Sequence, residues 1–339
     1  MDVILRSFGL VPFEYSIEKI GSGHIHQTYR LSGANNVDYI LQRVNKSVFK
    51  EPEIIASNLK IASDFLNKNF PEYSFLRSIN SVDSKEMYYD GEGFPWRLFP
   101  YRGGTTTIEK VDQPQEAFEA AKGFGQLTAY LHGIDVARFH ETIPKFHDLS
   151  CRFRQFELSL ANASEERKHI ASDLIEICQS SHYLVKEYEN LIASRVLTLR
   201  ITHNDTKINN ILFDEISRKA VLVIDLDTLM PGYFIYDLGD MVRTFVSPVT
   251  EEEKDFSKII FRKEIYAALL DGYLSQMGSI LSEQEKTAIP FAARMMTFIM
   301  ALRFLMDYLD NDVYYQTYYP GQNLVRAGNQ LRFMELIPV

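Results

Sequence analysis

The sequence contains little cysteine, with only two such residues among 339. Cys151 and Cys178 are too few for a disulfide framework or a four-cysteine zinc site. We therefore expect both to be packing thiols in a reducing compartment. Basic residues are also in the minority, since 36 Lys and Arg stand against 45 Asp and Glu, which gives a formal net charge of −9. A nucleic-acid-binding surface needs clustered cations, so this balance argues against one while leaving room for a local phosphate pocket.

Long hydrophobic runs are missing as well. The most apolar segment, Met295–Leu302, ends at Arg303 and falls far short of the ~18–20 residues that span a bilayer. The first residues, MDVILRSFGLVPFEYS, do not combine a cationic start with a long apolar run, so we expect no secretory signal. Hydrophobic residues make up 46% and charged residues 24% of the chain, as in ordinary globular proteins. We expect a cytoplasmic protein of enzyme size without a membrane partner.

Apolar patterning divides the chain into two parts. Short strands are predicted in the first hundred residues at Ser16–Ile20, Thr28–Ser32, Tyr39–Val44, Met87–Tyr89 and Trp96–Tyr101. Helical spacing predicts one helix over Lys50–Lys68 and another over Pro114–His132. Mainly helical patterns follow, interrupted over 196–228 by short apolar runs. The composition predicts an α+β protein with an N-terminal lobe (1–98), a linker (99–104) and a larger, mainly helical C-terminal lobe (105–339).

The segment from Ile201 to Arg243 groups polar side chains around a predicted hairpin. Asn210 precedes the apolar run ILF, and the run AVLVI ends just before Asp225. A turn between these runs makes them antiparallel, so the entry and exit of the hairpin lie at the same end. Asn210 and Asp225 should therefore lie close together, with Asp205 just upstream in the loop.

Oxygen ligands in this arrangement suit Mg²⁺ and a triphosphate. Phosphoryl transfer needs an Asp that takes the acceptor hydroxyl proton, and an Asn and an Asp that hold the metal. We predict Asp205 as the catalytic residue, Asn210 and Asp225 as metal ligands, and ATP and Mg²⁺ as cofactors. Asp227 is a reserve ligand if the strand continues. Because Asn and Asp also favour turns, the alternative is that these are turn residues only.

These motifs carry a family resemblance. HNDTKINNILFD, VLVIDLDTLMPG and YDLGDMVR resemble the aminoglycoside phosphotransferase and choline kinase superfamily. The stretches GSGHIHQTYRL, ILQRVNKSVFKEPE, IPKFHDLSCRF and LRFLMDYLDNDVYY resemble, more narrowly, its N-acetylhexosamine 1-kinase branch. The resemblance covers essentially the whole chain and implies a protein-kinase-like two-lobed fold. It also implies transfer of the γ-phosphoryl group of ATP to the anomeric hydroxyl of an N-acetylhexosamine or related sugar.

Two alternatives to that function stay open. The first is a superfamily kinase with another acceptor, such as an aminoglycoside, choline or homoserine. The second is a catalytically inactive nucleotide-binding regulator. The second alternative is supported by the absence of the expected strand lysine from the small lobe. The intact set of Asp205, Asn210 and Asp225 argues against it.

A glycine turn is the candidate phosphate-covering loop. Gly21, Ser22 and Gly23 lie between two predicted strands, where backbone amides can approach phosphate oxygens closely. A plain β-turn is the alternative. No Walker A sequence, GxxxxGK[ST], occurs in the chain.

A kinase small lobe also needs a cation on the next strand and a glutamate on the following helix. The strand YILQRV has no lysine, so we predict Arg43 in that role, with Gln42 on the opposite strand face as the alternative. Glu53 is the predicted partner of that cation, and Glu51 is the alternative.

Adenine is expected against the backbone of the linker. The candidate residues are Phe99 and Tyr101, because Pro100 between them lacks an N–H group.

The acceptor side centres on Arg303, which lies in an apolar helix and needs a partner. That partner is either Asp307 at i+4 or a bound sugar or phosphate. The resemblance implies that Arg303, Tyr314 and His24 contact the hexosamine. It also implies that Asp237 accepts hydrogen bonds from the catalytic loop.

The remaining polar residues of these segments have more local interpretations. We expect Asp240 and Arg243 to form a helix pair, and His203 to support the loop. His26 stands where the branch commonly has an acidic or amide residue, a departure that can change which sugar is accepted.

Overall fold

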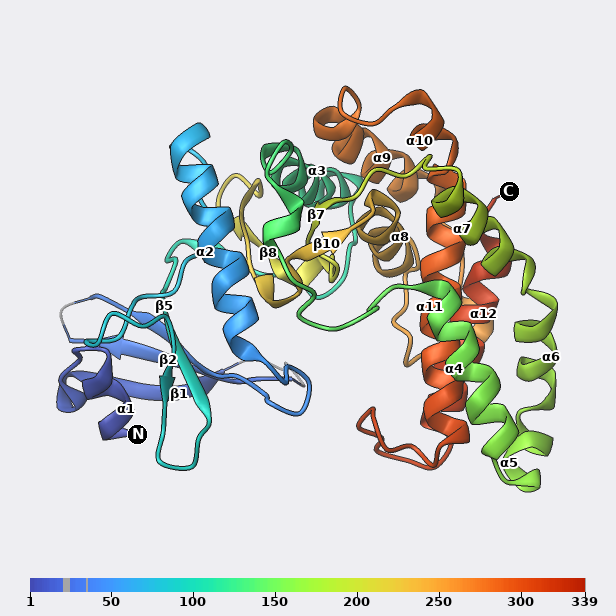
Figure 1. Ribbon diagram of the computed structural model, residues 1–339, viewed down its shortest axis with the longest axis horizontal. Coiled ribbons are helices and arrows are strands. Elements are labelled where there is room, and N and C mark those ends of the chain that lie inside the picture. Colours follow the sequence, from blue (N-terminus) through green and yellow to red (C-terminus); the bar gives the residue numbers. More distant parts are fainter. Residues whose placement is uncertain (21–24, 35, 339) are drawn as a thin grey trace.

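A five-stranded antiparallel sheet forms the N-terminal part of the chain (Figure 1). The computed structural model describes residues 1–20, 25–34 and 36–338. The strand order is β1-β2-β3-β5-β4. The strands are β1 (Tyr15–Ile20), β2 (Gln27–Gly33), β3 (Tyr39–Arg43), β4 (Tyr88–Tyr89) and β5 (Pro95–Pro100). The predicted strands are confirmed to within two residues at each end.

Two helices pack against this sheet or beside it. The short helix α1 (Asp2–Ser7), which the sequence analysis missed, buries Ile4 and Leu5 in a small cluster with Leu31, Leu41 and Trp96 of the sheet. The long helix α2 (Pro52–Asn69) has a proline in its first turn and buries one stripe of its surface. Its buried side chains belong to the larger hydrophobic cluster of the C-terminal lobe. Figure 1 shows α2 between the sheet and that lobe.

The C-terminal lobe is mainly helical and contains two small sheets. One sheet joins β6 (Thr105–Thr106), β8 (Ile211–Asp214) and β9 (Ala220–Val223), and the other joins β7 (Arg200–Thr202) and β10 (Met230–Gly232). The helices are α3 (Pro114–Tyr130), α4 (Leu149–Asn162), α5 (Glu165–Ile170), α6 (Ser172–Ser180), α7 (Tyr183–Ala193), α8 (Phe234–Phe245), α9 (Lys263–Met277), α10 (Glu283–Thr287), α11 (Ile289–Leu309) and α12 (Gln322–Leu336). The expected linker 99–104 overlaps the last two residues of β5.

Helix α11 is the central helix of this lobe, in contact with α4, α8 and α12 (Figure 1). Among the described residues it alone is long and apolar enough to cross a membrane, yet 78% of its most apolar window is buried in the protein. Its apolar character therefore reflects packing on nearly all sides. Arg303 lies within it and is only partly buried.

Close packing of α8 on α11 fixes the helix that follows the hairpin. A Cβ atom placed on Gly239 of α8 would lie 2.3 Å from the carbonyl oxygen of Ala292 and 2.5 Å from Cγ of Met296. Such an approach tolerates only glycine, because backbone cannot yield as a flexible side chain does.

We therefore expect Gly239→Ala to lower the free energy of unfolding by about 1–3 kcal/mol, the usual cost of overpacking. Urea unfolding measures this change. The matched control is Gly91→Ala, because a Cβ at Gly91 meets nothing within 4 Å. Equal unfolding midpoints for the two variants would contradict the packing argument.

Candidate active site

The β8–β9 hairpin holds the two predicted metal ligands at one end. The backbone N–H of Ile224 donates to the carbonyl oxygen of Asn210 at 2.9 Å, which makes the entry and exit of the hairpin neighbours. The Nδ2 group of Asn210 donates to the backbone oxygen of Asp205 at 2.8 Å, and its distance to Asp205 Oδ2 is 3.4 Å. The predicted grouping of Asp205, Asn210 and Asp225 is thus present.

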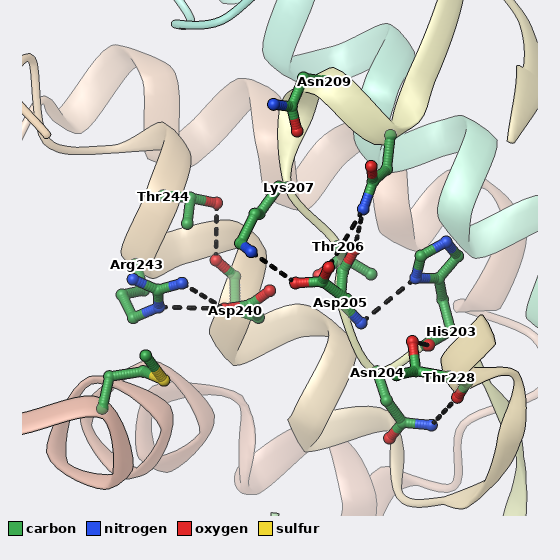
Figure 2. Close-up of polar contacts among 12 residues, drawn as sticks. His203, Asn204, Asp205, Thr206, Lys207, Asn209, Thr228, Asp240, Arg243 and Thr244 are labelled. Atoms are coloured by element: carbon green, nitrogen blue, oxygen red, sulfur yellow. Dashed lines mark hydrogen bonds and ion pairs between the residues drawn. The ribbon is translucent and has the colours of Figure 1, made fainter. Parts of the chain in front are cut away.

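A buried carboxylate supports the loop that carries Asp205. Asp237 on α8 accepts hydrogen bonds from the backbone N–H groups of His203 at 3.0 Å and Asn204 at 2.7 Å. Burial raises the pKa of Asp237 to about 6. The neighbouring Asn204 has a left-handed backbone, with φ of 65°, and its Nδ2 donates to the oxygen of Thr228 at 2.9 Å (Figure 2). These bonds hold the backbone of the two residues that precede Asp205.

His203 supports the same loop, as predicted. Its Nε2 lies 2.9 Å from the carbonyl oxygen of Ile224, and its Nδ1 lies 3.2 Å from the backbone N of Asp205. Because the Asp205 N–H must donate to Nδ1, the ring proton belongs on Nε2, which then donates to Ile224. The imidazole therefore links the loop to the hairpin exit.

Lys207 faces Asp205 and was missed by the sequence analysis. Its Nζ lies 3.1 Å from Asp205 Oδ1 (Figure 2). Burial raises the pKa of Asp205, but the nearby charge of Lys207 offsets this effect and leaves that pKa below its ordinary value. Asp205 is therefore ionised near neutral pH, as a proton acceptor must be. The signal for Lys207 was its place two residues after Asp205, the predicted catalytic residue.

Asp225 stands in strained backbone at the exit of the hairpin. Its φ is 55° and its ψ is 54°, a left-handed conformation that Asp tolerates better than most residues. Burial and the negative charges of Asp227 and Asp205 raise the pKa of Asp225. A divalent cation would relieve this repulsion, and carboxylate and amide oxygens are the ligands that Mg²⁺ prefers. The donor set therefore fits a metal held by Asn210 and Asp225.

Asp227, the predicted reserve metal ligand, has ligand atoms within 4.8 Å of those of Asp225 and His26, and it is also bound by the N-terminal lobe. Its Oδ1 lies 2.5 Å from Nη1 of Arg97, and its Oδ2 lies 2.8 Å from Nη2 of Arg97 and 2.7 Å from Nε2 of His26. All three side chains are almost fully buried. The backbone N–H of Asn45 donates to Nδ1 of His26 at 3.1 Å, so His26 donates to Asp227 through Nε2. Both oxygens of Asp227 are thus occupied by the N-terminal lobe.

Arg97 was not predicted, whereas Arg43 was. In the sheet register Gln42 pairs with Arg97, and Gln42 Oε1 accepts from Nε of Arg97 at 2.9 Å and from its Nη2 at 2.6 Å. Arg43 points to the other face of β3, where its guanidinium lies 4.3 Å from the ring centre of Phe94. The structure therefore places the alternative residue Gln42, and not Arg43, beside Arg97, which binds the carboxylate of Asp227. The missed signal was an arginine within the apolar strand PWRLFP.

The other residues that were predicted to bind the nucleotide do not lie together. Glu53 is exposed and accepts a hydrogen bond from the hydroxyl of Tyr89, so the structure does not pair it with Arg43. Phe99 is buried, with the Arg97 guanidinium 5.1 Å from its ring centre. The backbone N–H of Tyr101 donates to the oxygen of Asp38 at 3.1 Å, which leaves it occupied within the sheet. Gly21, Ser22, Gly23 and His24 lie outside the described residues.

The structure brings together Arg303 and Tyr314, the two residues that the resemblance assigns to the acceptor. The guanidinium carbon of Arg303 lies 5.1 Å from the ring centre of Phe146, 5.5 Å from that of Tyr315 and 5.9 Å from that of Tyr314. We call these four residues the acceptor-side cluster. Asp307 does not pair with Arg303, because its carboxylate accepts hydrogen bonds from the backbone N–H groups of Tyr314 and Tyr315 and from Asn323.

The acceptor-side cluster adjoins the catalytic loop through His147. The rings of Phe146 and His147 are 4.2 Å apart, and His147 Nε2 lies 2.8 Å from the backbone oxygen of Asn204. Burial lowers the pKa of His147 to about 4, so the ring is neutral and donates to that oxygen. On the other side of the loop, Asp240 and Arg243 form the predicted helix pair at 2.9 Å (Figure 2).

Comparison with known proteins identifies the family. The model of the phosphotransferase enzyme family matches residues 16–279. The chain belongs to this family. Its fold is the protein-kinase-like fold of solved structures in the aminoglycoside phosphotransferase and choline kinase superfamily, as predicted.

Three of those structures span nearly the whole chain. Amicoumacin kinase hAmiN, in complex with AMP-PNP and Ca²⁺, shares 14% identity over 96% of this chain and 90% of its own, with a TM-score of 0.64. An aminoglycoside phosphotransferase from Alicyclobacillus acidocaldarius shares 12% over 96% and 93%, with a TM-score of 0.63. A choline/ethanolamine kinase family protein from Mesorhizobium loti shares 16% over 96% and 88%, with a TM-score of 0.57.

Substitution of Arg97 should have a larger effect than substitution of Arg43, because only Arg97 pairs with Asp227. Arg97→Met leaves the buried Asp227 carboxylate without its cation, so we expect a loss of about 3–5 kcal/mol in the free energy of unfolding. We also expect a higher KM for ATP, because Asp227 lies two residues from Asp225. Urea unfolding and ATP kinetics measure the two effects.

Arg43→Met is the matched control, since Arg43 forms no ion pair with a carboxylate of the described residues and is only partly buried. It should change stability by less than about 1 kcal/mol. Adding Asp227→Asn to Arg97→Met should recover part of the loss. The reverse order of effects, with ATP affinity depending on Arg43 alone, would restore Arg43 as the phosphate-binding cation.

Proposed function

We propose that this protein is an ATP-dependent sugar kinase. It transfers the γ-phosphoryl group of ATP, with Mg²⁺, to the anomeric hydroxyl of an N-acetylhexosamine or a related sugar. The observation that carries the phosphoryl transfer is the grouping of Asp205, Asn210 and Asp225 at one end of the hairpin. Membership of the phosphotransferase enzyme family supports the same reaction class.

Each of these side chains has a separate task. Asp205, ionised and held by the loop, orients the acceptor hydroxyl and accepts its proton. Asn210 and Asp225 hold the metal, which when bound neutralises charge on the phosphate oxygens. Lys207, only 3.1 Å from Asp205, places a cation where charge develops on the transferred group.

The acceptor-side cluster favours a sugar over a cationic acceptor. Aminoglycosides and choline carry positive charge, which needs carboxylates or an aromatic cage without a competing cation. Here the aromatic rings surround the guanidinium of Arg303, whose one hydrogen bond among the described residues is to the sulfur of Met300. A cationic acceptor would be repelled, whereas sugar hydroxyl groups can accept hydrogen bonds from Arg303.

Asp205→Asn should lower kcat by roughly 10²–10⁴-fold, because it removes the proton acceptor without removing the metal ligands. The KM for ATP should change little. Steady-state kinetics measure both values, with Asp214→Asn at the far end of the hairpin as the control. Near-normal turnover by the Asp205→Asn variant would refute the assignment of Asp205.

Phosphate transfer to a panel of acceptors tests the sugar. The panel is GlcNAc, GalNAc, glucose, galactose, choline and kanamycin with ATP and Mg²⁺, followed by ³¹P NMR. We expect a sugar 1-phosphate signal. Product from choline or kanamycin alone would indicate another acceptor class, and ATP binding without transfer to any acceptor would favour the inactive regulator.

A further inference from the structure

A second arginine lies beside the acceptor-side cluster. Arg152 on α4 donates from Nε and Nη2 to the backbone oxygen of Phe146, at 3.1 Å and 2.9 Å. Its Nη1 donates to Gln155 at 2.9 Å. Because the ring of Phe146 also contacts Arg303, this one residue is bordered by two guanidinium groups from different helices. Two positive charges therefore meet at one wall of the acceptor side.

Within the described residues neither arginine forms an ion pair with a carboxylate. The carboxylates nearest in sequence are engaged elsewhere. Asp148 caps α4 by accepting from the backbone N–H of Cys151, and Asp307 accepts from Tyr314, Tyr315 and Asn323. Burial and the positive charge of Arg303 lower the pKa of Arg152. Two partly buried cations with no counter-ion are unfavourable unless an anion joins them.

An unsatisfied hydroxyl group adds a third donor. The Oη atom of Tyr315 is buried and has no hydrogen-bond partner in the described structure, while its ring lies against Arg303. A buried polar atom without a partner costs free energy, so such atoms commonly meet a ligand or a water. Arginine pairs with carboxylate and phosphate oxygens through parallel N–H groups. Arg152, Arg303 and Tyr315 thus form a donor set suited to an oxyanion.

This donor set belongs to the acceptor side because Phe146 adjoins the catalytic loop. Phe146 stacks on His147, which bonds the backbone oxygen of Asn204, and Asn204 precedes Asp205. A sugar with its reacting hydroxyl at Asp205 can therefore extend toward the two arginines. The sugar substituent remote from the reacting hydroxyl is the group that would contact Arg152 and Arg303.

We propose that Arg152, Arg303 and Tyr315 form an oxyanion subsite, and that the acceptor is an acidic sugar whose anionic substituent binds there. This inference rests on the proposed function and narrows its substrate class. A carboxylate and a phosphate ester share the required chemistry. The neutral hydroxyl that receives the phosphoryl group remains at Asp205.

Kinetics on matched sugars test the subsite. The pairs are glucose with glucuronate and galactose with galacturonate, and glucose 6-phosphate distinguishes a phosphate from a carboxylate. We expect the acidic member to have a KM at least about tenfold lower, as one charge-assisted hydrogen-bonded pair provides. Arg152→Gln should remove this preference, Arg152→Lys should restore it in part, and the KM for ATP should stay the same in both.

Arg154→Gln is the matched control, because Arg154 lies on the same helix and is exposed. It should leave the preference for acidic sugars intact. A general folding defect in the Arg152 variants would instead raise the KM for ATP and lower kcat for every sugar.

The outcomes separate this inference from the proposed function. Transfer to GlcNAc with no preference for acidic sugars would overturn the subsite and leave the sugar kinase standing. Transfer to choline or kanamycin alone would overturn both. If no acceptor reacts, calorimetry with glucuronate decides: binding that Arg152→Gln abolishes supports the subsite, and no binding to the unaltered protein overturns it.

Discussion

The contact of Asp227 with Arg97 and His26 is the interaction on which the active site depends. It joins the sheet of the N-terminal lobe to the loop that follows the β8–β9 hairpin. Two residues upstream, Asp225 is in a left-handed conformation that the chain would not adopt without support. With Asp227 fixed by three polar contacts, Asp225 is held in its place at the hairpin exit. The small lobe therefore positions Asp225, the proposed metal ligand, which belongs to the large lobe.

A kinase small lobe ordinarily places a strand lysine near the nucleotide phosphates. In this chain the corresponding strand offers Gln42, and the cation beside it comes from Arg97 on the neighbouring strand β5. Gln42 orients the guanidinium through one oxygen that accepts two N–H groups, which leaves the other side of Arg97 for Asp227. In other kinases a single lysine supplies this charge. Here Arg97 carries the charge, and the amide of Gln42 positions it.

Local pattern predicted the strands, the long helices and the hairpin, because each depends on neighbours in the sequence. The proximity of Asn210 and Asp225 followed from hairpin geometry alone. Arg97 could not be found that way, since its function depends on the pairing of β3 with β5, whose residues lie 55 positions apart. The same holds for the approach of Arg152 to Arg303, because these residues lie on α4 and α11 and come together only when the two helices pack. Long-range register and packing, unlike spacing, leave no local signature.

Charge is distributed unequally across the active site. On the metal side, burial and the negative charges of Asp227 and Asp205 raise the pKa of Asp225, and this is an arrangement that a divalent ion stabilises. On the proposed acceptor side, Arg152 and Arg303 form no ion pair with a carboxylate of the described residues, and Lys207 adds a third cation beside Asp205. A ligand that bridges the two sides would place its metal-bound phosphates against the carboxylates and its acceptor against the cations. This distribution of charge supports the proposal that the acceptor is a neutral or anionic sugar and not a cation.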